Sequence, residues 1–320
     1  MNDGMSTSTT NTNTQSQAIA PTPHLHLSRP SLRTVAELLK PITWFPPMWA
    51  FGCGVVSSGV ATEGKWLVIA TGVILAGPMV CATSQAANDW FDRHVDAINE
   101  PNRPIPSGRM PGRWGFNIAI LWTLLSLAVA ASLGTWVLGA AALGLALAWA
   151  YSAPPLRFKQ NGWIGNAACG ISYEGLAWVT GAAVMLGGAM PDNKTLMLAL
   201  LYSIGAHGIM TLNDFKSIKG DTEMGVKSLP VQHGASGAAY IACLMMLLPQ
   251  MIVAGLLVSW GTTNYAIAVV VLIVAQIALM ARFVKDPIGR ATWYSAIGIN
   301  FFVSGMMVSA FAVRSLGISA

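Results

Sequence analysis

A polar segment directly after a long apolar run, NDWFDRHVDAINE at 88–100, holds four of the chain's thirteen acidic residues. If a helix continues through it, the side chains of Asn88, Asp92 and Asp96 repeat every four residues and lie on one face. A face of carboxylate and amide oxygens is typical of a site for a hard cation. Mg2+ is the natural candidate, because it shares its coordination shell with phosphate oxygens. The alternative is a solvated acidic helix end.

A second acidic segment, NDFKSIKGDTEMGVKSLPV, also follows an apolar run. Its carboxylates Asp214 and Asp221 are seven residues apart and would share a helix face, unless Gly220 ends the helix before Asp221. Ser217 stands between them. On the same side of a membrane as the first segment, this one would complete a two-metal or bridged-metal site.

Basic residues lie close to these segments in the sequence. Arg103 follows the first segment in a loop rich in proline and glycine, and Arg157 and Lys159 follow another apolar run in YSAPPLRFKQNGW. Carboxylate-bound Mg2+ flanked by cations is a combination that binds a diphosphate. We therefore predict that these three residues contact a diphosphate, with the alternative that they only mark the cytoplasmic side. For Arg109 and Arg113 we favour that alternative.

The elements that position these residues are membrane-spanning helices. Hydrophobic residues make up 54% of the chain and charged residues 10%, and the mean hydropathy is +0.55. Many apolar blocks approach or exceed the ~18 residues that a spanning helix needs. We predict an all-α polytopic membrane protein whose nine spans lie near 42–60, 66–87, 115–133, 135–151, 164–186, 195–213, 237–259, 264–282 and 292–313.

The distribution of Lys and Arg predicts the orientation. With nine spans and a cytoplasmic N-terminus, the opposite side carries only Lys65, Lys194 and Arg314 of the chain's 18 basic residues. This asymmetry follows the positive-inside rule and places both acidic segments in the cytoplasm. It also explains the net charge of +5, so we predict no nucleic-acid partner. We expect residues 1–30 to form a disordered polar tail and residues 31–320 to form one domain.

The two acidic segments resemble the Asp-rich motifs of the UbiA-type intramembrane prenyltransferases. The string NDWFDRHVDAINEPNRPIPSGR is similar to the first motif and NDFKSIKGDTEMGVKSLPV to the second. With KPITWFPPMWAFGCG at 40–54 and YSAPPLRFKQNGW at 151–163, they resemble the branch that contains chlorophyll and bacteriochlorophyll synthases. The resemblance implies nine helices around a central cavity with a cytoplasmic-side cap. Its implied metal ligands are Asn88, Asp92, Asp96, Asp214 and Asp221.

The resemblance also implies the substrates. The donor would be geranylgeranyl or phytyl diphosphate, the acceptor the propionate of bacteriochlorophyllide a, the cofactor Mg2+, and the location a bacterial inner membrane. Tyr151, Tyr173 and Glu174 are candidates for the acceptor pocket; each has the alternative of an interfacial or internally paired side chain. Ser217 departs from the family, because many relatives have a second Asp four residues before Asp221.

Other functions remain as alternatives. Chlorophyll synthase, or a UbiA-type prenyltransferase with an aromatic acceptor, would use the same diphosphate site. A cation-coupled transporter would be expected to place its carboxylates near the middle of the bilayer rather than at one mouth.

Overall fold

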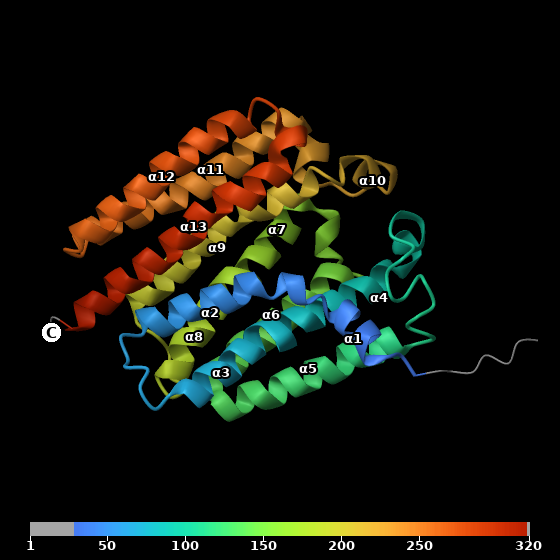
Figure 1. Ribbon diagram of the computed structural model, residues 1–320, viewed down its shortest axis with the longest axis horizontal. Coiled ribbons are helices and arrows are strands. Elements are labelled where there is room, and N and C mark those ends of the chain that lie inside the picture. The colour runs from blue at the N-terminus through green and yellow to red at the C-terminus, as the bar shows by residue number, and fades with distance from the viewer. Residues whose placement is uncertain (1–28, 319–320) are drawn as a thin grey trace, which may run out of the picture.

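The computed structural model describes residues 29–318, and its regular elements are helices (Figure 1). This confirms the all-α prediction, whereas the predicted polar tail lies almost entirely outside the described residues. The helical elements are α1 Leu32–Leu39, η1 Pro41–Thr43, α2 Phe45–Ser57, α3 Trp66–Ile74, η2 Leu75–Cys81, α4 Ala82–Asn99, α5 Trp114–Leu133, α6 Thr135–Ser152, η3 Phe158–Gln160, α7 Gly162–Gly170, η4 Ile171–Leu176, α8 Ala177–Met185, α9 Asn193–Asp214, α10 Ile218–Glu223, α11 Leu229–Ser259, α12 Thr263–Phe283 and α13 Pro287–Ile318.

Seven helices of the described region are long and apolar enough to cross a membrane. The first of them is continuous from Trp66 to Asn99 and comprises α3, η2 and α4; the others are α5, α6, α9, α11, α12 and α13. The predicted first and fifth spans correspond to α2 and to the consecutive α7, η4 and α8, which are not among the seven. The chain is therefore an integral membrane protein, but the predicted count of nine spans is not confirmed.

The helices pack as two groups. In Figure 1, α11, α12 and α13 lie along one long side, and α3, α5 and α6 lie along the opposite one. Helix α9 packs against α11 and α7, while α2 packs against α8, and α13 also contacts α2 and α9. Helices α2, α7, α8 and α9 therefore connect the two groups.

Helices α2 and α8 approach each other backbone to backbone. A Cβ atom added to Gly54 would lie 2.0 Å from the carbonyl oxygen of Trp178, and one added to Gly181 would lie 2.0 Å from that of Phe51. Small residues allow this approach, which is a common way to pack helices in lipid. The indole of Trp178 donates a hydrogen bond to Ser57 Oγ at 2.9 Å and stacks on Tyr202.

Two π-helical segments, η2 and η4, interrupt long helices. Pro78 lies inside η2 and has no N–H to donate; its own carbonyl oxygen accepts a hydrogen bond from Trp122. A π-helical turn changes the angular position of the residues that follow it, and such turns are frequent at functional sites.

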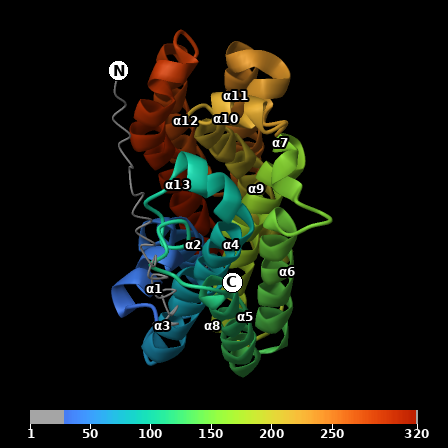
Figure 2. The ribbon, with the colours of Figure 1, turned by 90° about the vertical axis from the view of Figure 1, so that its right-hand side faces the viewer.

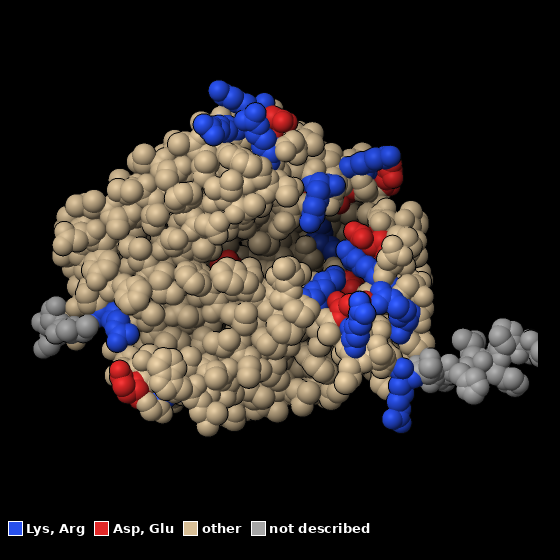
Figure 3. Space-filling model, viewed as in Figure 1, with Lys and Arg blue, Asp and Glu red and all other residues tan. Residues whose placement is uncertain are grey.

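Most of the charged residues gather at one end of the molecule. On the face shown in Figure 3 most of them lie near α10, the C-terminal end of α4 and the α12–α13 turn, a few lie at the opposite end, and most of the remaining surface is uncharged. Figure 2 looks onto the end that carries α10 and α4. The C-terminal end of α13 lies at the opposite end of the molecule (Figure 1).

Candidate functional site

A polar cavity of about 550 Å³ lies at the charged end. It is built by the C-terminal part of α4, the end of α6, the segment between α6 and α7, the start of α7, and the segment from the end of α9 to the start of α11. Both acidic segments reach it. Its lining residues are Asn88, Asp92, Val95, Tyr151, Arg157, Lys159, Gln160, Gly162, Gly165, Asn166, Asp214, Ser217, Asp221, Met224, Val226 and Ser228.

Asn88 and Asp92 are one helical turn apart on α4. The Asn88 amide donates hydrogen bonds to Asp92 Oδ2 at 2.8 Å and to Ser152 Oγ at 3.1 Å. The ammonium group of Lys159 forms an ion pair with the other carboxylate oxygen, Asp92 Oδ1. Burial lowers the pKa of Lys159 although Asp92 opposes the shift. A positive charge is thus held in a half-buried position beside the first acidic segment.

The second acidic segment is not one continuous helix. Helix α9 ends at Asp214 and α10 begins at Ile218, so the break comes before Gly220, which lies inside α10. Asp214 Oδ2 accepts a hydrogen bond from the Asn166 amide at 3.3 Å. Burial raises the pKa of the Asp221 carboxyl, and the nearby Ser228 hydroxyl acts in the opposite direction. A cation in the cavity would offset the cost of keeping this carboxylate ionised.

Asp96 and Arg103 do not line the polar cavity. Arg103 contacts Asp96 at 2.9 Å and Asp89 at 3.4 Å, and Lys40 contacts Asp89 at 2.6 Å. The reason is the helical repeat. Residues eight apart are rotated by about 80°, because a helix advances about 100° per residue, whereas residues seven apart are nearly aligned.

We call Lys40, Asp89, Asp96 and Arg103 the rear ion network. It lies on a different face of α4 from Asn88 and joins that helix to Lys40, directly after α1, and to Arg103 in the loop 100–113. Asp89 is only 1% exposed. Burial would lower the pKa of Arg103, but Asp89 and Asp96 more than offset this and raise it.

Arg157 and Lys159 lie on a segment with a constrained backbone. Arg157 adopts a left-handed conformation with φ of 37°, and its Nε has no hydrogen-bond partner among the described residues. Downstream, the Gly162 N–H donates to the Lys227 carbonyl at 2.7 Å, and the Lys227 N–H donates to the Gln160 carbonyl at 2.9 Å. These two bonds join the segment that carries both cations to the segment that follows Asp221.

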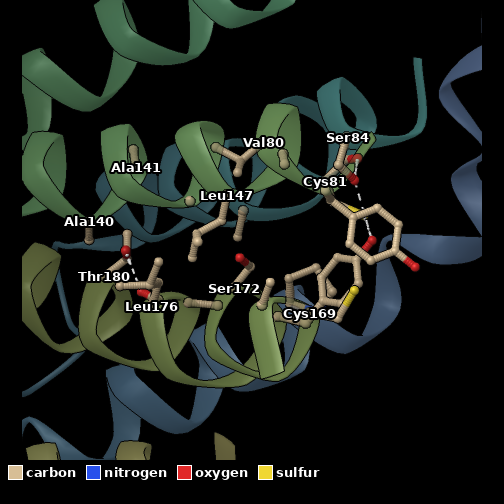
Figure 4. Close-up of a pocket in the computed structure, with 18 of the residues that line it drawn as sticks. Val80, Cys81, Ser84, Ala140, Ala141, Leu147, Cys169, Ser172, Leu176 and Thr180 are labelled. Atoms are coloured by element: carbon tan, nitrogen blue, oxygen red, sulfur yellow. Dashed lines mark hydrogen bonds between the residues drawn. The ribbon is translucent and has the colours of Figure 1, made fainter. Parts of the chain in front are cut away.

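An apolar chamber of about 270 Å³ adjoins the polar cavity (Figure 4). The two share Asn88 and Tyr151, which therefore mark the neck between them. Ser84, Cys81 and Cys169 lie toward one end of the view in Figure 4, and Ala140 and Thr180 toward the other. Helix α6, both π-helical segments and the adjoining parts of α4, α7 and α8 supply most of the wall.

The three candidates for the acceptor pocket lie in different places. Tyr151 is at the neck, and Tyr173 lines the chamber, where its hydroxyl accepts a hydrogen bond from Gln85 Nε2 at 3.1 Å. Glu174 lines neither space; it is 3% exposed, and its Oε2 has no hydrogen-bond partner within residues 29–318.

Sequence reasoning did not single out Asn166, Gln160 or Ser228, which also line the polar cavity. An amide within an apolar run is a signal that could have identified Asn166, since burying it requires hydrogen-bond partners.

The donor set of the polar cavity fits Mg2+. Asn88, Asp92, Asp214 and Asp221 supply carboxylate and amide oxygens, and no Cys or His is among the lining residues. In the described part of the chain, no group of three or more His, Cys, Asp or Glu side chains is placed to hold a metal ion. Mg2+ commonly takes one or two carboxylates together with substrate phosphates and water, rather than a cage made only of protein.

Curated proteins similar to this chain include two pigment synthases. The bacteriochlorophyll synthase 33 kDa chain of Cereibacter sphaeroides is 53% identical over 291 residues, which cover 91% of this chain and 96% of that one. The chloroplastic chlorophyll synthase of Oryza sativa is 41% identical over 291 residues, covering 86% and 75% of the two chains.

Solved structures share the fold. A structure of digeranylgeranylglyceryl phosphate synthase superposes with a TM-score of 0.69 at 23% identity and covers 88% of this chain and 98% of that one. A UbiA homologue from Archaeoglobus fulgidus bound to GPP and Mg2+ gives a TM-score of 0.60 at 18% identity, with 89% and 98% covered. The model of the UbiA prenyltransferase family matches residues 43–306. The chain belongs to the UbiA prenyltransferase family.

Proposed function

We propose that this prenyltransferase esterifies the propionate of bacteriochlorophyllide a with a C20 isoprenyl diphosphate, geranylgeranyl or phytyl, and releases diphosphate. The observation that carries the proposal is that both acidic segments line one polar cavity, which adjoins an apolar chamber at Asn88 and Tyr151. One space suits a diphosphate and the other an isoprenyl chain. The 53% identity to a bacteriochlorophyll synthase supports the choice of acceptor.

The diphosphate would occupy the polar cavity. Asn88, Asp92, Asp214 and Asp221 would hold Mg2+, which neutralises phosphate oxygens and makes diphosphate a better leaving group when bound. Lys159 would exchange its contact with Asp92 for one with a phosphate oxygen. Together with Arg157, it would stabilise the negative charge that develops as the bond between C1 and the diphosphate oxygen breaks.

Asp96 and Arg103 remain predicted site residues, but unlike the other six they do not line the polar cavity. Their contact to each other would be broken if either side chain turned toward a bound diphosphate. As placed, the pair would support the site by fixing α4 to the loop 100–113.

The acceptor reaction needs little help from the protein. A propionate has a pKa near that of a Glu side chain, about 4.3, so it is ionised at neutral pH and attacks C1 without a general base. Positive charge that develops on the allylic carbons at the neck would face the Tyr151 ring, and a Tyr ring stabilises a nearby cation. Tyr173 lies farther along the chamber wall, so a contact with the acceptor requires the macrocycle to reach that wall.

The surrounding assignments belong to the same proposal. The domain would comprise residues 31–320 and lie in the bacterial inner membrane, with the charged end and the N-terminus in the cytoplasm. The excess of Lys and Arg in segments on that side supports this orientation.

The decisive experiment is transfer by the purified full chain in lipid nanodiscs. We expect bacteriochlorophyllide a with geranylgeranyl or phytyl diphosphate to give the corresponding ester, identified by its mass, and we expect EDTA to abolish the reaction and added Mg2+ to restore it. Parallel assays use chlorophyllide a and 4-hydroxybenzoate as acceptors. Turnover of the phenol but not of either tetrapyrrole would overturn the proposed acceptor.

A further inference from the structure

The apolar chamber ends in a packed floor at a defined depth. At the far end from the neck lie Leu75, Ala141 and Thr180, which are 1%, 5% and 5% exposed. Leu75 and Ala141 belong to a buried cluster that includes Phe51 and Val137, both 0% exposed. An apolar chain that enters from the neck therefore meets close-packed side chains, which resist insertion of further methylene groups.

The depth of the chamber is set by the helices along it. From Asn88 at the neck to Leu75 at the floor the chain advances thirteen residues, and from Tyr151 to Ala141 ten. At 1.5 Å per residue the ten residues of α6 rise about 15 Å. The thirteen residues from Leu75 rise less than the ~20 Å of an uninterrupted α-helix, because Leu75–Cys81 is π-helical and has a smaller rise per residue. An extended isoprene unit adds four C–C bonds of about 1.5 Å, or about 5 Å along the chain. The chamber thus accommodates three to four isoprene units.

Gly144 lies about two-thirds of the way from Tyr151 to Ala141 on α6. It is seven residues from Tyr151 on α6, about 10 Å of helix rise, which corresponds to two isoprene units. A Cβ atom added there would lie 3.7 Å from both Val80 Cγ1 and Leu176 Cδ1, which line the facing walls. A methyl group would fit, whereas a larger side chain would project between these walls and obstruct the chamber.

We infer that the floor at Leu75 and Ala141 limits the donor to four isoprene units, and that Gly144 is a specificity-determining residue that keeps the path open beyond the second unit. This rests on the proposed function, because it assumes that the ligand is an isoprenyl diphosphate. The same floor would exclude donors of six or more isoprene units.

The test measures binding of isoprenyl diphosphates to the purified full chain with Mg2+ and without any acceptor. Donors of ten, fifteen, twenty and thirty carbons are compared by isothermal titration calorimetry. We expect the wild type to bind the C20 donor most tightly and the C30 donor at least 100-fold more weakly. We expect Gly144→Leu to bind the C10 donor within threefold of the wild type and the C20 donor at least 100-fold more weakly.

Gly139→Leu is the matched control. Gly139 is on the same helix but exposed, and in the described structure no atom lies within 4 Å of its added Cβ. It should bind all four donors as the wild type does. Unchanged C20 binding by Gly144→Leu, or an equal loss for the C10 and C20 donors, would overturn the inference.

Three further outcomes complete the test. If Gly144→Leu does not fold, the wild type decides, because C30 binding within threefold of C20 binding excludes a floor that limits length. If the donors bind with the expected dependence on length but no ester forms with bacteriochlorophyllide a, the proposed acceptor is wrong and the length limit stands. If no donor binds, both are wrong.

Discussion

At the scale of single residues, the polar cavity combines groups that are far apart in the sequence. Six of the eight residues predicted as metal or diphosphate contacts line it: Asn88, Asp92, Asp214, Asp221, Arg157 and Lys159. Residue type and spacing were sufficient to anticipate this grouping, because both acidic segments follow apolar spans and were predicted to lie on the same side of the membrane. The exceptions, Asp96 and Arg103, arise because a spacing of eight approximates two helical turns poorly.

The first prediction concerns the carboxylates. Asp92→Ala and Asp221→Ala should each lower kcat/KM for transfer at least 100-fold, because each removes an oxygen ligand for Mg2+ from the polar cavity. The measurement is initial rate against Mg2+ concentration with protein of unchanged yield. Glu223→Ala is the control, since Glu223 is exposed on the same short helix as Asp221. Normal turnover by either aspartate variant would refute the site.

The second prediction compares two cations. Lys159→Ala should weaken the kcat/KM for the donor by about 10–100-fold, because it removes charge-assisted contacts to the leaving diphosphate. Arg109→Ala should change it less than threefold, because Arg109 is exposed and pairs with Glu37. The assay is donor titration at saturating acceptor. A larger effect for Arg109 than for Lys159 would show that the cations are wrongly assigned.

At the scale of elements, hydropathy located most helices but not their irregularities. The π-helical segments η2 and η4 were not predicted, because hydropathy does not reveal whether a helix contains a π-helical turn. Gly220 was considered the alternative position for a break in the second acidic segment, whereas the break occurs earlier, where Ser217 directly precedes α10. Both differences affect residues of the site, since both π-helical segments line the chamber and the break separates Asp214 from Asp221.

The third prediction tests the contact between the two segments that cross the polar cavity. A Cβ atom at Gly162 would lie 2.7 Å from the Leu229 nitrogen, so Gly162→Ala should push these segments apart and lower the free energy of unfolding by about 1–3 kcal/mol. It should also raise KM for the donor, because Lys159 and Asp221 lie on the separated segments.

Thermal unfolding and donor titration measure the two effects. Gly139→Ala is the control, because its exposed helical position should gain up to about 1 kcal/mol from the better helix propensity of alanine. If Gly162→Ala were as stable as the wild type with an unchanged KM, the contact would have no role in positioning the site.

At the scale of the whole molecule, composition identified an integral membrane protein, and the positions of Lys and Arg along the chain predicted that its charges gather on one side. The number of spans was harder to predict, because α2 and the α7–η4–α8 region are short or interrupted and rich in small residues. Such segments can still pack deeply, as Gly54 and Gly181 show. Hydropathy measures the average preference of a segment for lipid, whereas burial against other helices depends on shape.

The fourth prediction concerns orientation. The charged end, with the polar cavity, should face the cytoplasm, and the C-terminal end of α13 should face the other side. A fluorescent-protein fusion, which folds only in the cytoplasm, should be bright at the N-terminus and dark at the C-terminus, and an alkaline phosphatase fusion should give the reverse activities. The same compartment for both termini would require an even number of spans.

The rear ion network fixes the orientation of α4 before substrate binds. Asp89 is nearly inaccessible and contacts both Lys40 and Arg103, so α4 cannot turn about its axis without breaking two charged contacts. The network thereby fixes the direction in which the Asn88 and Asp92 side chains project from α4. Because α4 loses this rotational freedom on folding, substrate binding then costs less conformational entropy.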